Sequence, residues 1–239
     1  MTTHTVHHNP VRSDLPPAPG APAQAQPSTR WALAGLVAGI AGAGAIASSL
    51  AVSAVYDESL DRDAAAIADK MGDFVPQMLA FHVLGMVSAV LMIVFAAGLY
   101  RRLRASLPAD STLPMIGFSG LFGTAIVVVL GTGLDTEFIF AAADGEIVVD
   151  EALVFYNHWI GTIPWIWGLL GLSGIVLFLA SRAGAVAKWL GLVGLLGGGL
   201  TLLLGISPLQ YMAGFTGPVG LVVVSLGFLV GDKAFRGRA

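Results

Sequence analysis

Four side chains in the sequence have the chemistry of a ligand site, two imidazoles and two carboxylates: His82, Asp135, Glu137 and His158. Each lies in or beside a long apolar run, and an ionisable group at membrane depth is costly enough to mark a functional site. Such a set matches the ligands of a divalent metal ion, and because imidazole titrates near neutral pH it also suits a proton relay. We expect the four to form one outward-facing polar pocket. A divalent metal is the candidate ligand, and no organic cofactor is predicted.

A second candidate site lies in the last apolar run, where Gln210 and Tyr211 stand close to Gly214, Gly217 and Pro218. Glycine and proline in this pattern predict an interrupted helix, and broken helices line the binding sites of many transporters. Gln210 and Tyr211 are therefore expected to line a substrate site.

Two Gly-x-Ser-Gly strings, around Ser119 and Ser173, resemble the serine motif of rhomboid intramembrane proteases, which also have a six-helix core. A serine nucleophile needs a base within hydrogen-bonding reach, and in rhomboids that histidine comes from the sixth span. The last two apolar runs of this chain contain no histidine. The chain also lacks cysteine, which excludes disulfides, thiolate metal sites and cysteine nucleophiles.

Composition identifies the solvent that surrounds these residues. The 239 residues are 56% hydrophobic and only 11% charged, and the mean hydropathy is +0.81. A soluble domain carries about 25% charged side chains because its surface must be hydrated. Most of this chain is therefore expected to lie in lipid. The net charge of −3 provides no basic field, which argues against nucleic acid as a partner.

The apolar runs predict an all-α, polytopic transmembrane helical bundle, since a bilayer core about 30 Å thick needs about 20 apolar residues in a helix. The last run is too long for one span, and Pro208 divides it because proline does not continue a helix from its interior. The six expected spans cover residues 31–55, 76–100, 112–134, 156–181, 189–206 and 209–231.

The segments outside the spans differ in composition. Residues 1–30 are rich in Pro, Ala and Gln with no periodic apolar face, which predicts a disordered tail. Residues 56–75 and 135–155 are expected to form partly ordered outer caps, and 232–239 a short C-terminal tail. In the first cap, apolar residues recur at helical spacing from Leu60 to Phe74, which predicts an amphipathic helix lying on the outer leaflet.

The basic residues set the orientation. Ten of the twelve lie in the two tails, between spans two and three, or between spans four and five, so both termini are expected in the cytoplasm. The two outer loops hold twelve carboxylates and two basic side chains, a net charge of −10, whereas the inner segments carry +7. Aromatic residues near the span ends support the same boundaries, with Trp31 and Trp189 inside and Tyr156, Trp165 and Trp167 outside.

Glycine pairs spaced four residues apart occur in spans one, five and six: Gly35 and Gly39, Gly194 and Gly198, Gly227 and Gly231. Small residues at this spacing let helix backbones approach closely. The pairs can serve packing within one chain or a homo-oligomer, and the sequence leaves both open.

The whole plan resembles uncharacterised six-helix membrane proteins of high-GC Gram-positive bacteria. The resemblance rests on the Pro/Ala-rich tail, the Gly/Ala-rich first span and the string Gly-Leu-Tyr-Arg-Arg-Leu-Arg at 98–104, which closes the second span. It implies a multi-pass protein of the bacterial plasma membrane and no particular activity. The leading hypothesis is a binding or transport-associated protein with an outward-facing pocket. The alternatives are a structural or interaction protein whose acidic outer face recognises a partner and, third, an intramembrane enzyme.

Overall fold

The computed structural model describes residues 29–144 and 148–232. The tail expected over 1–30 therefore lies almost wholly outside the described residues, as does most of the tail expected over 232–239. Three residues in the middle of the second expected cap, 145–147, lie outside them as well.

Within the described part of the chain every regular element is a helix, and six helical stretches are long and apolar enough to cross a membrane. For these residues the prediction of an all-helical fold with six such helices is confirmed. The α-helices are α1 (Arg30–Ala51), α2 (Ala64–Met71), α3 (Val75–Arg104), α4 (Leu113–Gly131), α5 (Asp135–Asp144), α6 (Asp150–Ile160), α7 (Leu170–Arg182), α8 (Lys188–Val193), α9 (Gly199–Ile206) and α10 (Ala213–Leu226). Two π-helical turns, η5 (Gly194–Gly198) and η7 (Gly227–Gly231), follow α8 and α10. The remaining short elements are 3-10 turns: η1 (Ala54–Tyr56), η2 (Glu58–Leu60), η3 (Gly72–Phe74), η4 (Ile163–Trp165) and η6 (Gln210–Met212).

Local sequence signals begin several of these helices. The carboxylate of Asp63 accepts a hydrogen bond from the amide of Ala66 at 2.9 Å and so caps α2. Both α3 and α4 have proline in their first turn, where its missing amide proton costs nothing. The first turn of α6 carries Asp150 and Glu151, whose negative charge complements the helix dipole.

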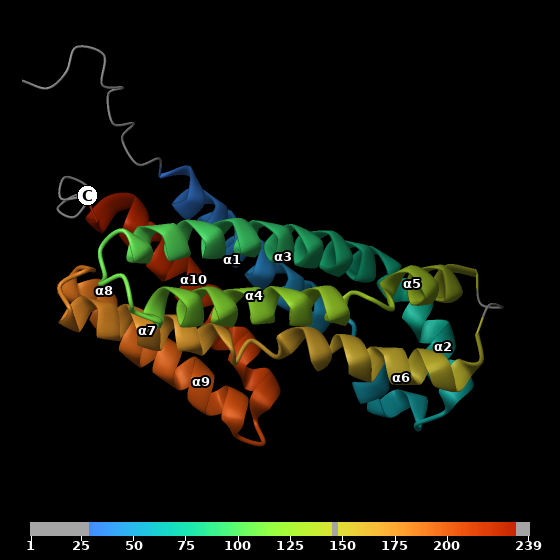
Figure 1. Ribbon diagram of the computed structural model, residues 1–239. Coiled ribbons are helices and arrows are strands. Elements are labelled where there is room, and N and C mark those ends of the chain that lie inside the picture. The colour runs from blue at the N-terminus through green and yellow to red at the C-terminus, as the bar shows by residue number, and fades with distance from the viewer. Residues whose placement is uncertain (1–28, 145–147, 233–239) are drawn as a thin grey trace, which may run out of the picture.

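The helices pack into an elongated bundle with two apolar cores (Figure 1). The larger core lies within the six long stretches, where α3 packs against α1 and α4, α10 against α1, and α7 against α4. The second core lies at the end of the bundle where α2, α5 and α6 gather, and it includes Met71, Phe81 and Tyr156, all fully buried. We call this end, formed by η1, η2, α2, α5, α6 and the first two turns of α3, the cap.

The amphipathic segment expected to lie on the outer leaflet instead packs against protein. Its apolar residues Ile67 and Met71 are buried in the second core, and α2 rests against α6. The prediction of an amphipathic helix from the periodicity is correct. Its apolar face, however, is covered by α6, which lies about 85 residues further along the chain.

The fourth span is not one continuous helix. It was expected over 156–181, yet α6 ends at Ile160 and α7 begins at Leu170, with η4 between them. Pro164 supplies the physical reason, because it lacks an amide proton and disfavours helical geometry in the residue before it. Pro164 and Trp165 are buried, so protein covers the break.

The interruption expected in the sixth span is wrong, since α10 runs without a break through Pro218. The two neighbouring glycines provide space for aromatic rings from the broken fourth span. A Cβ on Gly214 would lie 3.0 Å from the ring of Trp165, and one on Gly217 would lie 2.7 Å from the Cβ of Trp167. Trp165, Trp167 and Tyr156 are therefore buried between helices and do not lie on the lipid-facing surface expected for interfacial aromatics.

The three glycine pairs pack within the chain. A Cβ on Gly35 would collide with Phe95, one on Gly39 with Val222, and one on Gly231 with Trp189. Gly194 and Gly198 face Gly174 so closely that an added Cβ would lie 2.5 and 2.6 Å from backbone atoms of Gly174. These glycines account for close helix crossings inside one subunit and provide no separate argument for an oligomer.

Candidate functional site

His82, Asp135 and Tyr156 form one hydrogen-bonded group where the cap meets the long helices. Nδ1 of His82 lies 3.0 Å from Oδ2 of Asp135, and the hydroxyl of Tyr156 donates to Oδ1 at 2.8 Å. The Asp135 side chain is 0% exposed, whereas that of His82 is 37% exposed. The group therefore has a buried carboxylate at its centre and an imidazole that reaches the surface.

The hydrogen bonds assign the proton on the imidazole. An ionised carboxylate only accepts hydrogen bonds, so Nδ1 of His82 carries the proton in the pair with Asp135. In neutral imidazole the other nitrogen, Nε2, then has a free lone pair. The exposed edge of His82 is thus an acceptor held in a fixed orientation, and it becomes a cation when the ring is protonated.

Three separate elements position the group. His82 lies two turns into α3, Asp135 is the first residue of α5, and Tyr156 lies on α6. The ring of Tyr156 stacks on Phe138, with centroids 4.7 Å apart and planes 8° apart. This stacking fixes the phenol beside the carboxylate, because Phe138 lies one turn after Asp135 on the same helix.

Asn157 secures α6 against the end of α1. Its Nδ2 donates to the carbonyl oxygen of Val52 at 2.7 Å, and its Oδ1 accepts from the amide of Val55 at 3.0 Å. The side chain is fully buried and satisfies two backbone groups just after the last helical turn of α1. The position of Tyr156 is therefore determined by the residue next to it as well as by its own ring.

The other predicted site residues lie apart from this group. Glu137 is exposed on α5, and His158 is exposed on α6, where its ring meets Tyr56 edge-on at 6.0 Å between centroids. Gln210 and Tyr211 are exposed in η6, at the turn between α9 and α10. Of the four residues expected to converge, the structure brings His82 and Asp135 together and leaves Glu137 and His158 outside the group.

His82 and Asp135 are the members of the group that belong to the residue types expected as metal ligands. Among residues 29–144 and 148–232, no cluster of three or more His, Cys, Asp or Glu side chains could hold a metal ion. The third member of the group, Tyr156, was missed in the sequence because it was interpreted as an interfacial aromatic. The adjacent Asn157 was the available signal, since a polar side chain in an apolar run must find hydrogen bonds once it is buried.

The serine strings mark helix contacts. The hydroxyl of Ser173 is buried and donates to the carbonyl oxygen of Gly117 at 2.7 Å, which joins α7 to α4. Ser119 is exposed on α4. No hydrogen bond joins either hydroxyl to a histidine within the described residues, so a serine and base pair is not formed there.

The fold and the site together define a helical bundle in which six stretches are long and apolar enough to cross a membrane, with a capped end and a histidine–carboxylate–tyrosine group. Comparisons of the chain with protein-family models, curated proteins and solved structures gave no match.

Proposed function

We propose that the chain is a multi-pass protein of the bacterial plasma membrane, with both termini in the cytoplasm and the cap facing outward. Two layers of contacts support this placement. One contains Trp31, which packs on Phe95 and Phe228, and the other contains Ser49, which accepts a hydrogen bond from Trp165 at 2.7 Å. Trp31 and Ser49 are separated by a rise of about 27 Å along α1, close to the thickness of about 30 Å of a bilayer core.

Exposure supports the same placement. The outward faces of the long helices carry large apolar side chains that are about half exposed or more, among them Val90, Ile126, Leu203 and Val219. Such surfaces are unfavourable in water and favourable in lipid. His82 lies a rise of about 28 Å from Arg101 along α3, which puts it at the outer boundary and leaves the cap beyond it.

We further propose that the outward-facing group is a binding site for a small ligand that is positively charged or donates a hydrogen bond. The observation that carries this proposal is the half-exposed imidazole of His82, held by the buried carboxylate of Asp135. With Nδ1 turned toward Asp135, the surface presents an acceptor beside a negative charge. The acidic outer segments add a negative field that concentrates cations.

The distribution of titratable side chains along the helices favours binding over proton transport. Between His82 and Arg101, α3 contains no Asp, Glu, Lys, Arg or His. The whole of α4, from Leu113 to Gly131, contains none either. A proton relay needs titratable groups or ordered water at every step. The described helices provide such groups only at the two ends, which supports a site that binds from outside.

The topology is tested by cysteine labelling without background, since the native chain has no cysteine. Glu58→Cys, exposed in the cap, should react with a membrane-impermeant maleimide in intact cells. Asp110→Cys, exposed in the loop between α3 and α4, should react only after the cells are permeabilised. The reverse pattern would invert the orientation, and labelling of both in intact cells would refute the placement of that loop in the cytoplasm.

The binding site is tested through the protonation of His82. In protein with 15N-labelled histidine, His82 is assigned by the loss of its signals in His82→Gln. In mildly alkaline buffer we expect Nδ1 to carry the proton and Nε2 to be bare. Methylammonium should then shift the Nε2 signal, and acetate should not. No response to methylammonium would contradict the proposed ligand class.

Asp135→Asn provides the matched variant. When the asparagine oxygen accepts from Tyr156 as the carboxylate does, its amide faces Nδ1 of His82 and donates to it. The proton therefore moves to Nε2, which becomes a donor, and the negative charge is lost. Acetate should now perturb the signal and methylammonium should not. A response to methylammonium in Asp135→Asn as strong as in the native chain would contradict the role given to the negative charge of Asp135.

A second candidate function is recognition of a basic partner by the cap, and one observation favours it. Tyr56, Val149 and Phe155 are large exposed side chains on an end of the molecule that also carries many carboxylates. Both the hydroxyl and the amide of Ser59 donate to Asp57, which holds the pKa of that carboxyl below its usual value and keeps it charged. This function differs from the first because it does not need His82.

A further inference from the structure

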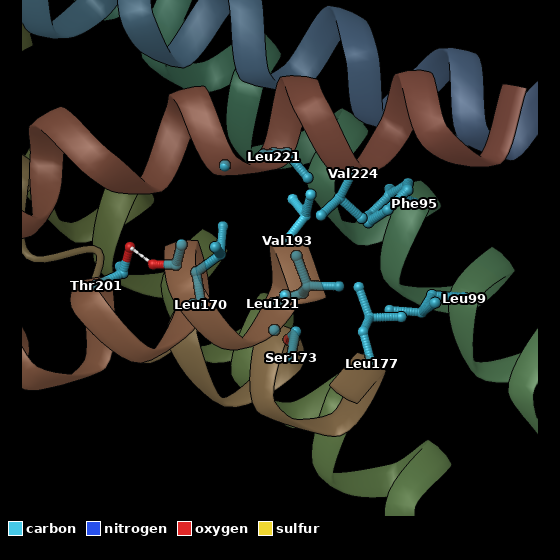
Figure 2. Close-up of a pocket in the computed structure, with 15 residues that line it drawn as sticks. Phe95, Leu99, Leu121, Leu170, Ser173, Leu177, Val193, Thr201, Leu221 and Val224 are labelled. Atoms are coloured by element: carbon cyan, nitrogen blue, oxygen red, sulfur yellow. Dashed lines mark hydrogen bonds between the residues drawn. The ribbon is translucent and has the colours of Figure 1, made fainter. Parts of the chain in front are cut away.

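An apolar pocket lies among α3, α4, α7, α10 and the helix formed by α8, η5 and α9 (Figure 2), and His82 does not line it. Its volume is about 30 Å³. Ser173 and Thr201 are the hydroxyl-bearing side chains of its lining, and both already donate within the protein: Ser173 to the carbonyl oxygen of Gly117, and Thr201 to that of Gly197 at 2.8 Å. Water in a pocket needs two to four polar partners, which this lining does not offer.

The pocket has a buried floor and a partly exposed rim. Phe95, Leu121 and Leu177 form the floor and are almost completely buried. The rim, by contrast, is half-buried and comes from two neighbouring helices: Val193 and Gly197 on one, Gly220 and Val224 on the other. The opening therefore lies between η5 and α10.

The opening exists because two glycines face empty space. A Cβ added to Gly197 or Gly220 would meet no atom within 4 Å, whereas one on the neighbouring Gly198 would lie 2.6 Å from the backbone of Gly174. Outside the rim, Leu192, Leu196 and Leu226 are exposed. The pocket thus opens onto a surface of apolar side chains.

We propose that this pocket binds the hydrocarbon chain of a phospholipid from the cytoplasmic leaflet, which enters sideways between η5 and α10. Phe95 and Leu99 lie a rise of only about 9 and 3 Å from Arg101 along α3, so this end of the pocket is at the depth of the inner acyl chains. The pocket has room for a few methylene groups of an acyl chain. A methylene group that enters it exchanges contacts with mobile lipid for close packing against the floor residues. The inference rests on the proposed insertion in a membrane.

The test uses the full chain in phosphatidylglycerol vesicles that contain a small fraction of lipid with a diazirine on one acyl chain. After photolysis, mass spectrometry locates the adducts. We expect adducts on floor residues Leu121 and Leu177 and on Leu203, which is exposed on the outside of α9. In Gly197→Leu/Gly220→Leu, whose new side chains fill the opening, the floor adducts should disappear while those on Leu203 remain.

Each other outcome contradicts a specific step. Adducts on Leu203 with none on the floor of the native chain would refute the pocket and leave membrane insertion standing, whereas no adducts on either would refute insertion as well. Gly199→Leu is the matched control, because its Cβ would meet only Ile175 at an ordinary 3.8 Å and Gly199 does not line the pocket. Equal loss of floor adducts in this control would show that the opening is not between the two rim glycines.

Discussion

Gly198→Leu should prevent the bundle from assembling in its native form. A Cβ at this position would lie 2.6 Å from the Cα of Gly174 and 2.9 Å from the carbonyl oxygen of Gly171. Both are backbone atoms of α7, so no side-chain rotation can relieve the overlap, and α7 has to move away from η5. Overpacking of a close-packed core costs about 1–3 kcal/mol and more where the backbone has to shift, so we expect at least about 3 kcal/mol here.

The measurement is the elution profile and thermal melting of the purified protein in detergent. Gly198→Leu should give aggregated protein or an apparent Tm lower by more than about 6 °C, since 1 kcal/mol corresponds to roughly 2–4 °C in a chain of this size. Gly197→Leu controls for the same change one residue away, where the new side chain meets open space. Leucine favours helix more than glycine does, so propensity cannot explain a loss. If the two variants melted at the same temperature, the close contact between Gly198 and the backbone of α7 would not be what stabilises the bundle.

The long helices were predictable because each depends on its own sequence. A run of about 20 apolar residues forms a spanning helix whatever its neighbours are, since backbone groups must pair within the segment in lipid. The first span was expected to begin at residue 31 and the second to end at residue 100, one residue from the start of α1 and four from the end of α3. The break at Pro164 was missed because proline is also tolerated inside membrane helices, as Pro218 is inside α10.

The candidate site was predictable only in part. His82 and Asp135 stood out because each is ionisable and close to an apolar run, a property of single residues. Tyr156 could not be selected in this way, since an aromatic at a span end has an interfacial role by default. The pairing of the three depends on how α5 and α6 fold over α3, a tertiary arrangement that leaves no local pattern in the sequence.

Arg102 shows the same limit at the opposite end of the bundle, where its guanidinium forms a buried ion pair with Asp232. The sequence assigned Arg102 only to the basic inner surface. In the structure its Nε donates to Oδ2 of Asp232 at 2.8 Å and its Nη2 to Oδ1 at 3.1 Å, and the two side chains are 11% and 3% exposed. Nη2 also donates to the carbonyl oxygen of Ala185 at 3.2 Å. The guanidinium thus joins α3 to the end of the last span and to the loop after α7.

Arg102→Met should therefore lower stability strongly, because it leaves the carboxylate of Asp232 buried without its partner. Breaking a buried pair costs about 3–5 kcal/mol, which corresponds to a fall in apparent Tm of roughly 10 °C. The double variant Arg102→Met/Asp232→Leu removes both charges and should recover most of the loss, since apolar replacements of a buried pair are often neutral. Arg101→Met, at the neighbouring exposed position, should melt like the native chain. If the two single arginine variants melt alike, the loss reflects the positive charge at this end of the bundle, and the ion pair contributes nothing beyond it.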